Sequence, residues 1–174
     1  MTHRCALIFN VTARQELMRT IVETLGVVVE EARLDFGEDG LSVRVVDPSH
    51  VAMIKMDVDS AAFETWEVDE TKLGLEMRKM HQFLSVAGAG DMVELAYNDE
   101  SGQATIHIGR IDLNLRPLDN STLNPPNVPS LELPCGVTIG GSELAQALRA
   151  AKLVGDLVNL SLSEDTFTVN VKGS

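Results

Sequence analysis

A unit of strand, helix, strand, tight turn and strand recurs three times along the chain, and this repeat most limits the folds open to it. The copies follow one another at intervals of roughly 65 residues. Alternating apolar and polar residues mark the strands, whereas apolar residues three or four apart mark the helices. Such a chain predicts an α+β fold of repeated βαββ units, in which antiparallel sheets carry the helices on one face.

The first unit ends in a hairpin whose turn, Gly37 to Gly40, has the glycine and aspartate that tight turns favour. Its predicted segments are 4–10 (strand), 12–25 (helix), 30–36 (strand) and 41–46 (strand). The apolar face of its helix consists of Leu17, Met18, Ile21, Val22 and Leu25. Thr12 and Gln15 have the spacing of a capping box, which predicts the start of this helix.

The second and third units repeat this order. The second unit has predicted segments 71–76 (strand), 77–87 (helix), 92–97 (strand) and 104–109 (strand), and its helix has the apolar face Met77, Met80 and Leu84. The third unit has segments 135–139 (strand), 142–153 (helix), 157–162 (strand) and 166–171 (strand), and its helix has the apolar face Leu144, Leu148 and Ala151. Further strands are expected at 51–57, 63–68 and 111–115.

A proline-rich segment separates the second unit from the third. Five of the six prolines lie between Pro117 and Pro134, and proline favours an extended, stiff chain. We therefore expect a first domain at 1–115, a connector at 116–134 and a second domain at 135–174. The first domain holds two units and the second only one, so the second domain is expected to be incomplete.

The chain is acidic, with a formal net charge of −12 and a pI of about 4.6. Taken alone, this charge disfavours a nucleic-acid partner, because phosphate binding normally needs a basic surface. Lys is scarcer than Arg among the 14 basic residues, and the acidic residues are spread along the chain. Dispersed acid with scarce Lys predicts a protein adapted to molar salt; the alternative is a soluble protein kept monodisperse by repulsion.

Several other classes of protein find little support in the sequence. Cys5 and Cys135 lie in apolar contexts, so we expect two buried thiols in a reducing cytoplasm and no metal site. No apolar run reaches the ~18 residues of a membrane span. Nucleotide-binding and hydrolase motifs are missing, so we expect the protein to have no cofactor and no catalytic activity. Asp47 with His50 remains a remote candidate for an acid–base pair.

The stretch Val46-Asp47-Pro48-Ser49-His50-Val51, with the strand 31–36 before it, resembles a motif of DNA sliding clamps of the proliferating cell nuclear antigen family. Ser142 to Ala145, Arg149 and Gly155-Asp156 resemble the first helix and following turn of the clamp's second domain. The proline-rich segment occupies the place of the interdomain connector. The acidity points to an archaeal halophile type of this family.

This resemblance implies a non-catalytic processivity factor, a closed homotrimeric ring with double-stranded DNA threaded through it. DNA polymerase, clamp loader, nuclease and ligase would dock on it through short peptides, which raises their concentration at the DNA. The alternatives are a subunit of a clamp-like checkpoint ring and a clamp fragment that forms no ring.

In such a ring the helices line the hole, so the polar helix faces would look toward DNA. The DNA-facing candidates are Arg19, Arg78, Lys79, His81, Arg149 and Lys152. Glu16 and Glu23 share this face, which predicts weak direct contact with DNA. Without the resemblance, these residues are ordinary solvated helix faces.

The resemblance also implies a pocket for partner peptides and a contact between subunits. The pocket candidates are Val46, His50, Met53, Val128 and Pro129. For Val46 and Met53 the alternative is packing in the core, and for His50 it is a role in a local turn. The subunit contact is expected along the edge strand that carries Ile111, Leu113 and Leu115.

Overall fold

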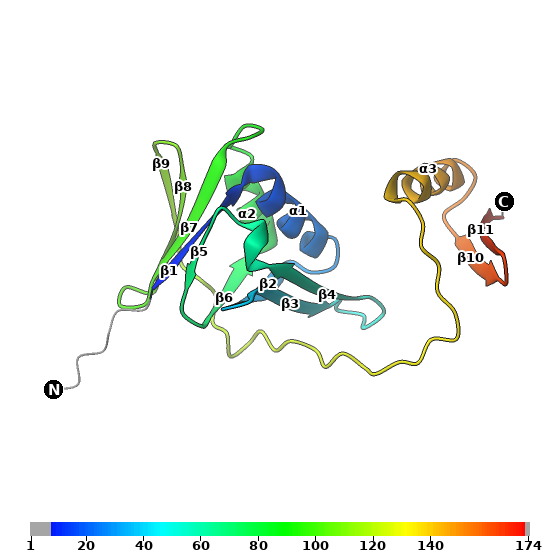
Figure 1. Ribbon diagram of the computed structural model, residues 1–174, viewed down its shortest axis with the longest axis horizontal. Coiled ribbons are helices and arrows are strands. Elements are labelled where there is room, and N and C mark those ends of the chain that lie inside the picture. The colour runs from blue at the N-terminus through cyan, green and yellow to red at the C-terminus, as the bar shows by residue number, and fades with distance from the viewer. Residues whose placement is uncertain (1–7, 173–174) are drawn as a thin grey trace. The chain divides into compact units, whose positions relative to one another are not determined.

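A computed structural model describes residues 8–172 of the chain. The described chain divides into two compact units, one ending at Val128 and one beginning at Pro129 (Figure 1). The boundary lies inside the segment expected as a connector. Each unit is described by itself below.

The first unit contains two antiparallel sheets and two α-helices (Figure 1). One sheet has the strand order β5 (Thr65–Val68), β1 (Phe9–Arg14), β7 (Met92–Asn98), β8 (Gln103–Ile108) and β9 (Ile111–Leu115). The other has the order β4 (Met53–Asp59), β3 (Gly40–Val46), β2 (Glu31–Gly37) and β6 (Thr71–Glu76). The helices are α1 (Gln15–Gly26) and α2 (Met77–Leu84), and a short 3-10 helix, η1 (Ser60–Ala62), joins β4 to β5.

The first unit is built from two modules that interlock. We call β1, α1, β2 and β3 the first module and β6, α2, β7 and β8 the second module. The strand before each helix pairs with the strand after the helix of the other module, so that β1 pairs with β7 and β6 pairs with β2. Because this exchange is reciprocal, it relates the two modules by an approximate two-fold symmetry. Each sheet therefore contains strands from both modules.

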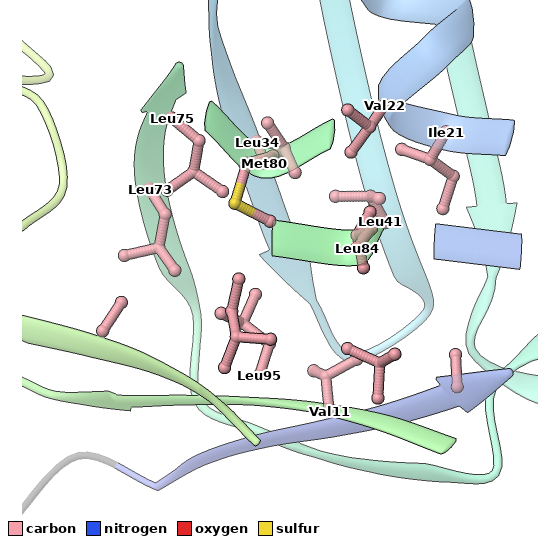
Figure 2. Close-up of a cluster of buried hydrophobic side chains, with 14 of the residues drawn as sticks. Val11, Ile21, Val22, Leu34, Leu41, Leu73, Leu75, Met80, Leu84 and Leu95 are labelled. Carbon is pink, nitrogen blue, oxygen red and sulfur yellow. The ribbon is translucent and has the colours of Figure 1, made fainter. Parts of the chain in front are cut away.

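One hydrophobic core fills the space shared by the two sheets and the two helices. Figure 2 shows side chains from both helices and from strands of both sheets pointing toward one another. Leu25 of α1, Leu84 of α2 and Leu73 of β6 are among its fully buried members. Burying an aliphatic side chain of this size contributes about 1.5–3 kcal/mol, so the core dominates the stability of the unit.

The second unit is a single module of α3 (Gly141–Lys152), β10 (Val158–Ser163) and β11 (Thr166–Val171), in which α3 packs near β11. The two strands form an antiparallel hairpin. Ala151 is the residue of α3 that is buried, whereas Leu144 is half-buried and Leu148 is exposed. The predicted apolar face of this helix is therefore only partly covered.

The α+β fold of repeated units predicted from the sequence is confirmed, with corrections at the start of the first unit. The strand predicted at 4–10 is Phe9–Arg14, and residues 4–7 lie outside the described chain. Thr12 is not a helix cap, because it lies within β1 and is paired with Thr65 and Glu94. Pairing with β7 carries the strand up to Arg14, so the helix begins at Gln15 without a side-chain cap.

Further corrections concern the third unit and the end of α2. Residues 135–139 form no strand, because no neighbouring strand lies beside them within residues 8–172 to supply hydrogen bonds. Cys135 is exposed, not buried as expected, and Cys5 falls outside the described residues. Helix α2 ends at Leu84, three residues before its predicted end, although Ala87 still packs in the core.

Candidate functional site

The polar faces of α1 and α2 carry charges that pair with one another. Glu23 of α1 accepts a hydrogen bond of 2.6 Å from Nε of Arg19, one turn earlier in the same helix. The same Glu23 oxygen lies 3.5 Å from Nδ1 of His81 on α2, so one carboxylate lies between the two helices. The three side chains remain about half exposed, so these pairs shape the charge of the face more than they stabilise the fold.

The other basic candidates of the first unit also have neighbours. Arg78 lies 3.7 Å from Glu76, and Nζ of Lys79 lies 5.7 Å from the ring centre of Phe83, within cation–π range. The predicted acidic residue Glu16 turns to the loop after α2, where it accepts a hydrogen bond of 2.7 Å from the amide of Gly90. The face therefore presents cations whose charge is largely balanced.

Arg149 and Lys152 lie in the second unit, in the last turn of α3, and both are exposed. A cation at this end of a helix also complements the helix dipole. Their position in the last turn fits the helix-end role, and the DNA-facing role stays a prediction.

The Asp47 loop, residues 47–52, is held together by one carboxylate. Asp47 accepts hydrogen bonds from the amides of Ser49 (3.0 Å), Val51 (2.7 Å) and Ala52 (2.6 Å). Its own amide donates to the carbonyl of Ala52 at 2.9 Å, which closes the loop. The hydrogen bond from the Ala52 amide, with those from Val51 and Ser49 and the nearby His50, holds the pKa of Asp47 below its usual value.

His50 occupies the turn of this loop with a φ of 56°, in the left-handed region that few non-glycine residues adopt. The bonds to Asp47 hold this conformation and leave the side chains of His50 and Val51 exposed. Because the Asp47 carboxylate is occupied by backbone amides, it has a structural role in this loop, and the structure gives no support to an Asp47–His50 acid–base pair.

A groove of about 170 Å³ lies beside this loop, between β2–β3 and the connector. Its lining residues are Val29, Glu31, Ala32, Arg33, Arg44, Val45, Val46, Thr122, Leu123, Asn124, Pro125 and Pro126. Val46 is also the direct cross-strand partner of Met53 on β4, so these two side chains project from the same face of the sheet. The face next to the loop is thus mixed, with Val46 and Met53 beside the charged side chains of Arg33 and Arg44, and it is partly covered by the connector.

The connector is held against β6 by a close approach that requires glycine. The amide of Leu118 donates to the carbonyl of Gly74 at 2.8 Å, and the side chain of Asn120 donates to the carbonyl of Lys72 at 2.7 Å. A Cβ at Gly74 would come within 2.7 Å of Leu123 Cδ1 and 3.0 Å of the Leu118 carbonyl oxygen. The first half of the expected linker is therefore docked on the first unit.

The structure brings some of the predicted pocket residues together and leaves others apart. Val46 lies in the groove with Met53 beside it, and His50 stands in the adjoining loop. Val128 is exposed and is not among the groove's lining residues, and Pro129 belongs to the second unit. Sequence reasoning missed the part of the connector that lines the groove, Leu123 to Pro126; the adjacent prolines 125 and 126 were the available signal.

The predicted subunit contact lies on β9, the outermost strand of its sheet. Ile111 is exposed, Leu113 is half-buried against the core and Leu115 is buried. On the inner side β9 pairs with β8, where His107 and Asp112 lie 2.7 Å apart. An outermost strand offers backbone groups for pairing, so any contact here uses the backbone more than these side chains.

Two other kinds of site receive no support from the described residues. Within residues 8–172, no group of three or more His, Cys, Asp or Glu side chains is placed to hold a metal ion. Among the helices of that part of the chain, none is long and apolar enough to cross a membrane.

Comparison with known proteins identifies this arrangement. The model of the family "Proliferating cell nuclear antigen, N-terminal domain" matches residues 10–113. A DNA polymerase sliding clamp of Methanosarcina barkeri is 34% identical over 166 residues, which are 95% of this chain and 68% of that protein. One of Halobacterium salinarum is 29% identical over 168 residues, with the same coverage.

The structure of A. fulgidus PCNA bound to the C-terminal region of FEN-1 matches with a TM-score of 0.90 and 30% identity, over 95% of this chain and 68% of that one. Two interlocked modules, with antiparallel sheets and paired helices, thus define a sliding clamp. The chain belongs to the proliferating cell nuclear antigen family of DNA polymerase sliding clamps.

Proposed function

We propose that this chain is the ring-forming subunit of a non-catalytic processivity factor, which encloses double-stranded DNA and tethers DNA polymerase and other replication and repair enzymes to it. The observation that carries the proposal is the Asp47 loop beside a groove that Val46 lines under the connector, on a fold matched at a TM-score of 0.90 by a clamp bound to a nuclease segment. We propose the division 1–115, 116–134 and 135–174 for its two domains and connector.

Partner peptides dock, in this proposal, on Val46 and Met53 with His50 at the rim. We also propose Val128 and Pro129 of the connector as contacts for such a peptide, on the family resemblance alone. The exposed side chain of Val51 and the neighbouring side chains of Val46 and Met53 support an occupant with aliphatic or aromatic side chains. Nuclease, ligase, clamp loader and polymerase would compete for this surface.

DNA passes the face that carries Arg19, Arg78, Lys79 and His81, with Arg149 and Lys152 contributing from α3. The pairing of Glu23 with Arg19 and His81 supports weak direct contact between this face and DNA. The DNA is then retained because the ring encloses it, and strong binding is not needed. We propose a homotrimeric ring, in which the strand bearing Ile111, Leu113 and Leu115 pairs with a neighbour.

The net charge of −12 and the similarity to a Halobacterium salinarum clamp support a cytoplasm of high salt as the working environment. At ~1 M salt the Debye length is only ~3 Å, so a basic lining would add little attraction for DNA. An acidic ring can then enclose DNA without strong repulsion.

Primer extension tests this proposal. An archaeal DNA polymerase copies a primed linear template in molar KCl, where a ring can thread over a free end without a loader. We expect longer products per binding event when the chain is added, and no effect when both template ends are blocked by bulky protein. Product lengths that do not change on addition of the chain would contradict the proposed function.

A further inference from the structure

Basic side chains form a row across the four-stranded sheet of the first unit, on the face that points away from the core. Arg44 on β3 is the cross-strand partner of Lys55 on β4. The β2–β3 register pairs Leu34 with Val43, and one step further along it brings Arg33 opposite Arg44. Like charges on directly opposite positions of a sheet repel each other and destabilise it. This row is therefore expected to need acidic partners.

The two outer members of the row have such partners on their own strands. Arg33 donates two hydrogen bonds to Asp35, of 2.8 Å from Nε and 2.9 Å from Nη2. Nζ of Lys55 lies 2.9 Å from the carboxylate of Asp57. Each of these acidic residues stands two positions from its cation on the same strand, so both charges are balanced within the sheet.

Arg44, the middle member of the row, lacks a partner of this kind. Among residues 8–172, no carboxylate oxygen lies within 4.0 Å of its guanidinium nitrogens. The pKa of Asp57 is lowered by its bonds to Lys55 and Ser42 and, more weakly, by the charge of Arg44, so that carboxylate is already occupied. Arg44 is also half-buried. A charge that loses water without gaining an acidic partner is costly, and a ligand that supplies a carboxylate removes this cost.

The charge of Arg44 lies in the groove beside the Asp47 loop. Arg44, Arg33 and Glu31 line this groove on the sheet side, and the uncharged connector residues 122–126 line it on the other side. The groove thus has two cations and one anion, although the whole chain has a net charge of −12. A local excess of positive charge on an acidic protein favours an acidic occupant.

Arg44 and Val46 are placed to contact neighbouring positions of one peptide. They stand two residues apart on β3, in a strand whose side chains alternate between buried and half-buried, so both project from the face that carries the groove. Two residues of a strand span ~7 Å, which is also the spacing of alternate side chains in an extended peptide. A peptide with an apolar side chain on Val46 can therefore place an acidic side chain at Arg44.

We propose that Arg44 is a specificity-determining residue of this groove and binds an Asp or Glu side chain of the docked partner peptide. The acidic residue stands about two positions from the apolar residue that contacts Val46. A guanidinium holds a carboxylate through two parallel N–H···O bonds, which adds directional selectivity to the attraction. This inference rests on the docking surface proposed above and adds a charge requirement to it.

A half-buried contact suits the high salt proposed for this protein. At ~1 M salt the Debye length is ~3 Å, so exposed charges barely attract a partner from a distance. Pairs in direct contact and partly buried are screened much less than exposed pairs. The pair at Arg44 therefore keeps its selectivity for acidic partners under conditions that weaken charge selectivity elsewhere on the surface.

Peptide pairs that differ only in charge test the contact. A peptide from the C-terminal region of an archaeal FEN-1 is made in a neutral form, with Asn and Gln in place of every Asp and Glu. Derivatives carry a single Glu or, as the matched peptide, a single Gln at successive positions. Their affinities for the full chain are measured by calorimetry in molar KCl. We expect Glu to bind at least about fivefold more tightly than Gln at a position two residues from an apolar residue.

Variants of the clamp assign this preference to one side chain. Arg44→Gln should bring the ratio of the Glu and Gln affinities close to one. Lys72→Gln is the matched control, because it removes the same charge from the same face of the sheet at a residue that does not line the groove. We expect Lys72→Gln to keep the preference for Glu.

The outcomes separate this inference from the proposed function. Binding of the neutral peptide without a preference for Glu at any position would overturn the role of Arg44 and leave the docking surface standing. A preference that Arg44→Gln keeps, or that Lys72→Gln loses equally, would also overturn it. Binding of none of the peptides to the wild-type chain would contradict the docking surface, and the role of Arg44 with it.

Discussion

Glu23 of α1 and His81 of α2 lie 3.5 Å apart, and the same Glu23 oxygen accepts a hydrogen bond from Arg19. A single carboxylate therefore contacts two of the side chains proposed to face DNA, the cation of Arg19 and the imidazole of His81, which is charged only when protonated. This explains in local terms how a clamp of net charge −12 presents a helix face that is neither strongly attractive nor strongly repulsive to phosphate.

Removal of this carboxylate should strengthen DNA binding. Glu23→Gln frees Arg19 and His81 to meet phosphate, so we expect a severalfold gain in affinity for duplex DNA at ~0.1 M salt and a steeper fall of affinity with salt. Fluorescence anisotropy of a labelled duplex over a salt series measures both. Glu67→Gln on β5 removes the same charge from an edge strand of the five-stranded sheet and should have little effect. Equal gains in both variants would refute the assignment of this face.

The Asp47 loop should loosen on acidification. The folded-state pKa of Asp47 is lowered, so its contribution is present above the usual carboxyl pKa of ~3.9 and is lost as pH falls through the lower, folded value. Amide exchange at Val51 and Ala52 should therefore accelerate below that value, and Asp47→Asn should show faster exchange already at pH 7. Asp57→Asn, whose carboxylate bonds Lys55 and Ser42, should leave these amides protected.

The close contact at Gly74 predicts a specific cost for adding one methyl group. Gly74→Ala forces Leu118 and Leu123 away from β6, which should destabilise the first unit by about 1–3 kcal/mol and expose the connector to trypsin after Arg116. Gly37→Ala is the matched control, because a Cβ there meets nothing within 4 Å. Thermal unfolding and limited proteolysis measure the two effects, and identical behaviour of the variants would show that the connector does not dock at Gly74.

Salt should stabilise this chain through screening. With 26 acidic and 14 basic residues, repulsion among carboxylates grows as salt is removed. We expect the Tm to rise between ~0.1 M and ~2 M KCl, most steeply at the low end where the Debye length changes most. A Tm that rises on dilution of the salt would contradict adaptation to a salt-rich cytoplasm.

The sequence predicted the parts of the fold that depend on local pattern. Strands β6, β9 and β11 begin and end where alternation predicts, and the Met77–Met80–Leu84 face of α2 is buried as expected. The failures arise from partners distant in sequence. Pairing with β7 extended β1 past Thr12, and the lack of a neighbouring strand within the described chain left Cys135 to Ile139 unpaired.

The candidate site was predictable in its types of residue but not in its contacts. The motif around Asp47 located the loop through its resemblance to the clamp family, and the loop is short enough for one carboxylate to accept from amides two to five residues later. The partnership of Glu23 with His81 depends on how two helices pack, and the approach of Leu123 to Gly74 depends on a connector crossing a sheet. Such contacts between distant segments leave no periodic signal in the chain.

Binding of a partner peptide tests the central claim most directly. A peptide from the C-terminal region of an archaeal FEN-1 is titrated into the full chain by calorimetry in molar KCl. We expect saturable binding by the wild-type chain. The double variant Val46→Ala, Met53→Ala should weaken this binding at least about tenfold, or ~1.4 kcal/mol. Met92→Ala is the control, since Met92 is 42% exposed on β7 and Met53 is 39% exposed on β4. Wild-type affinity in the Val46→Ala, Met53→Ala variant, or an equal loss in Met92→Ala, would contradict the account.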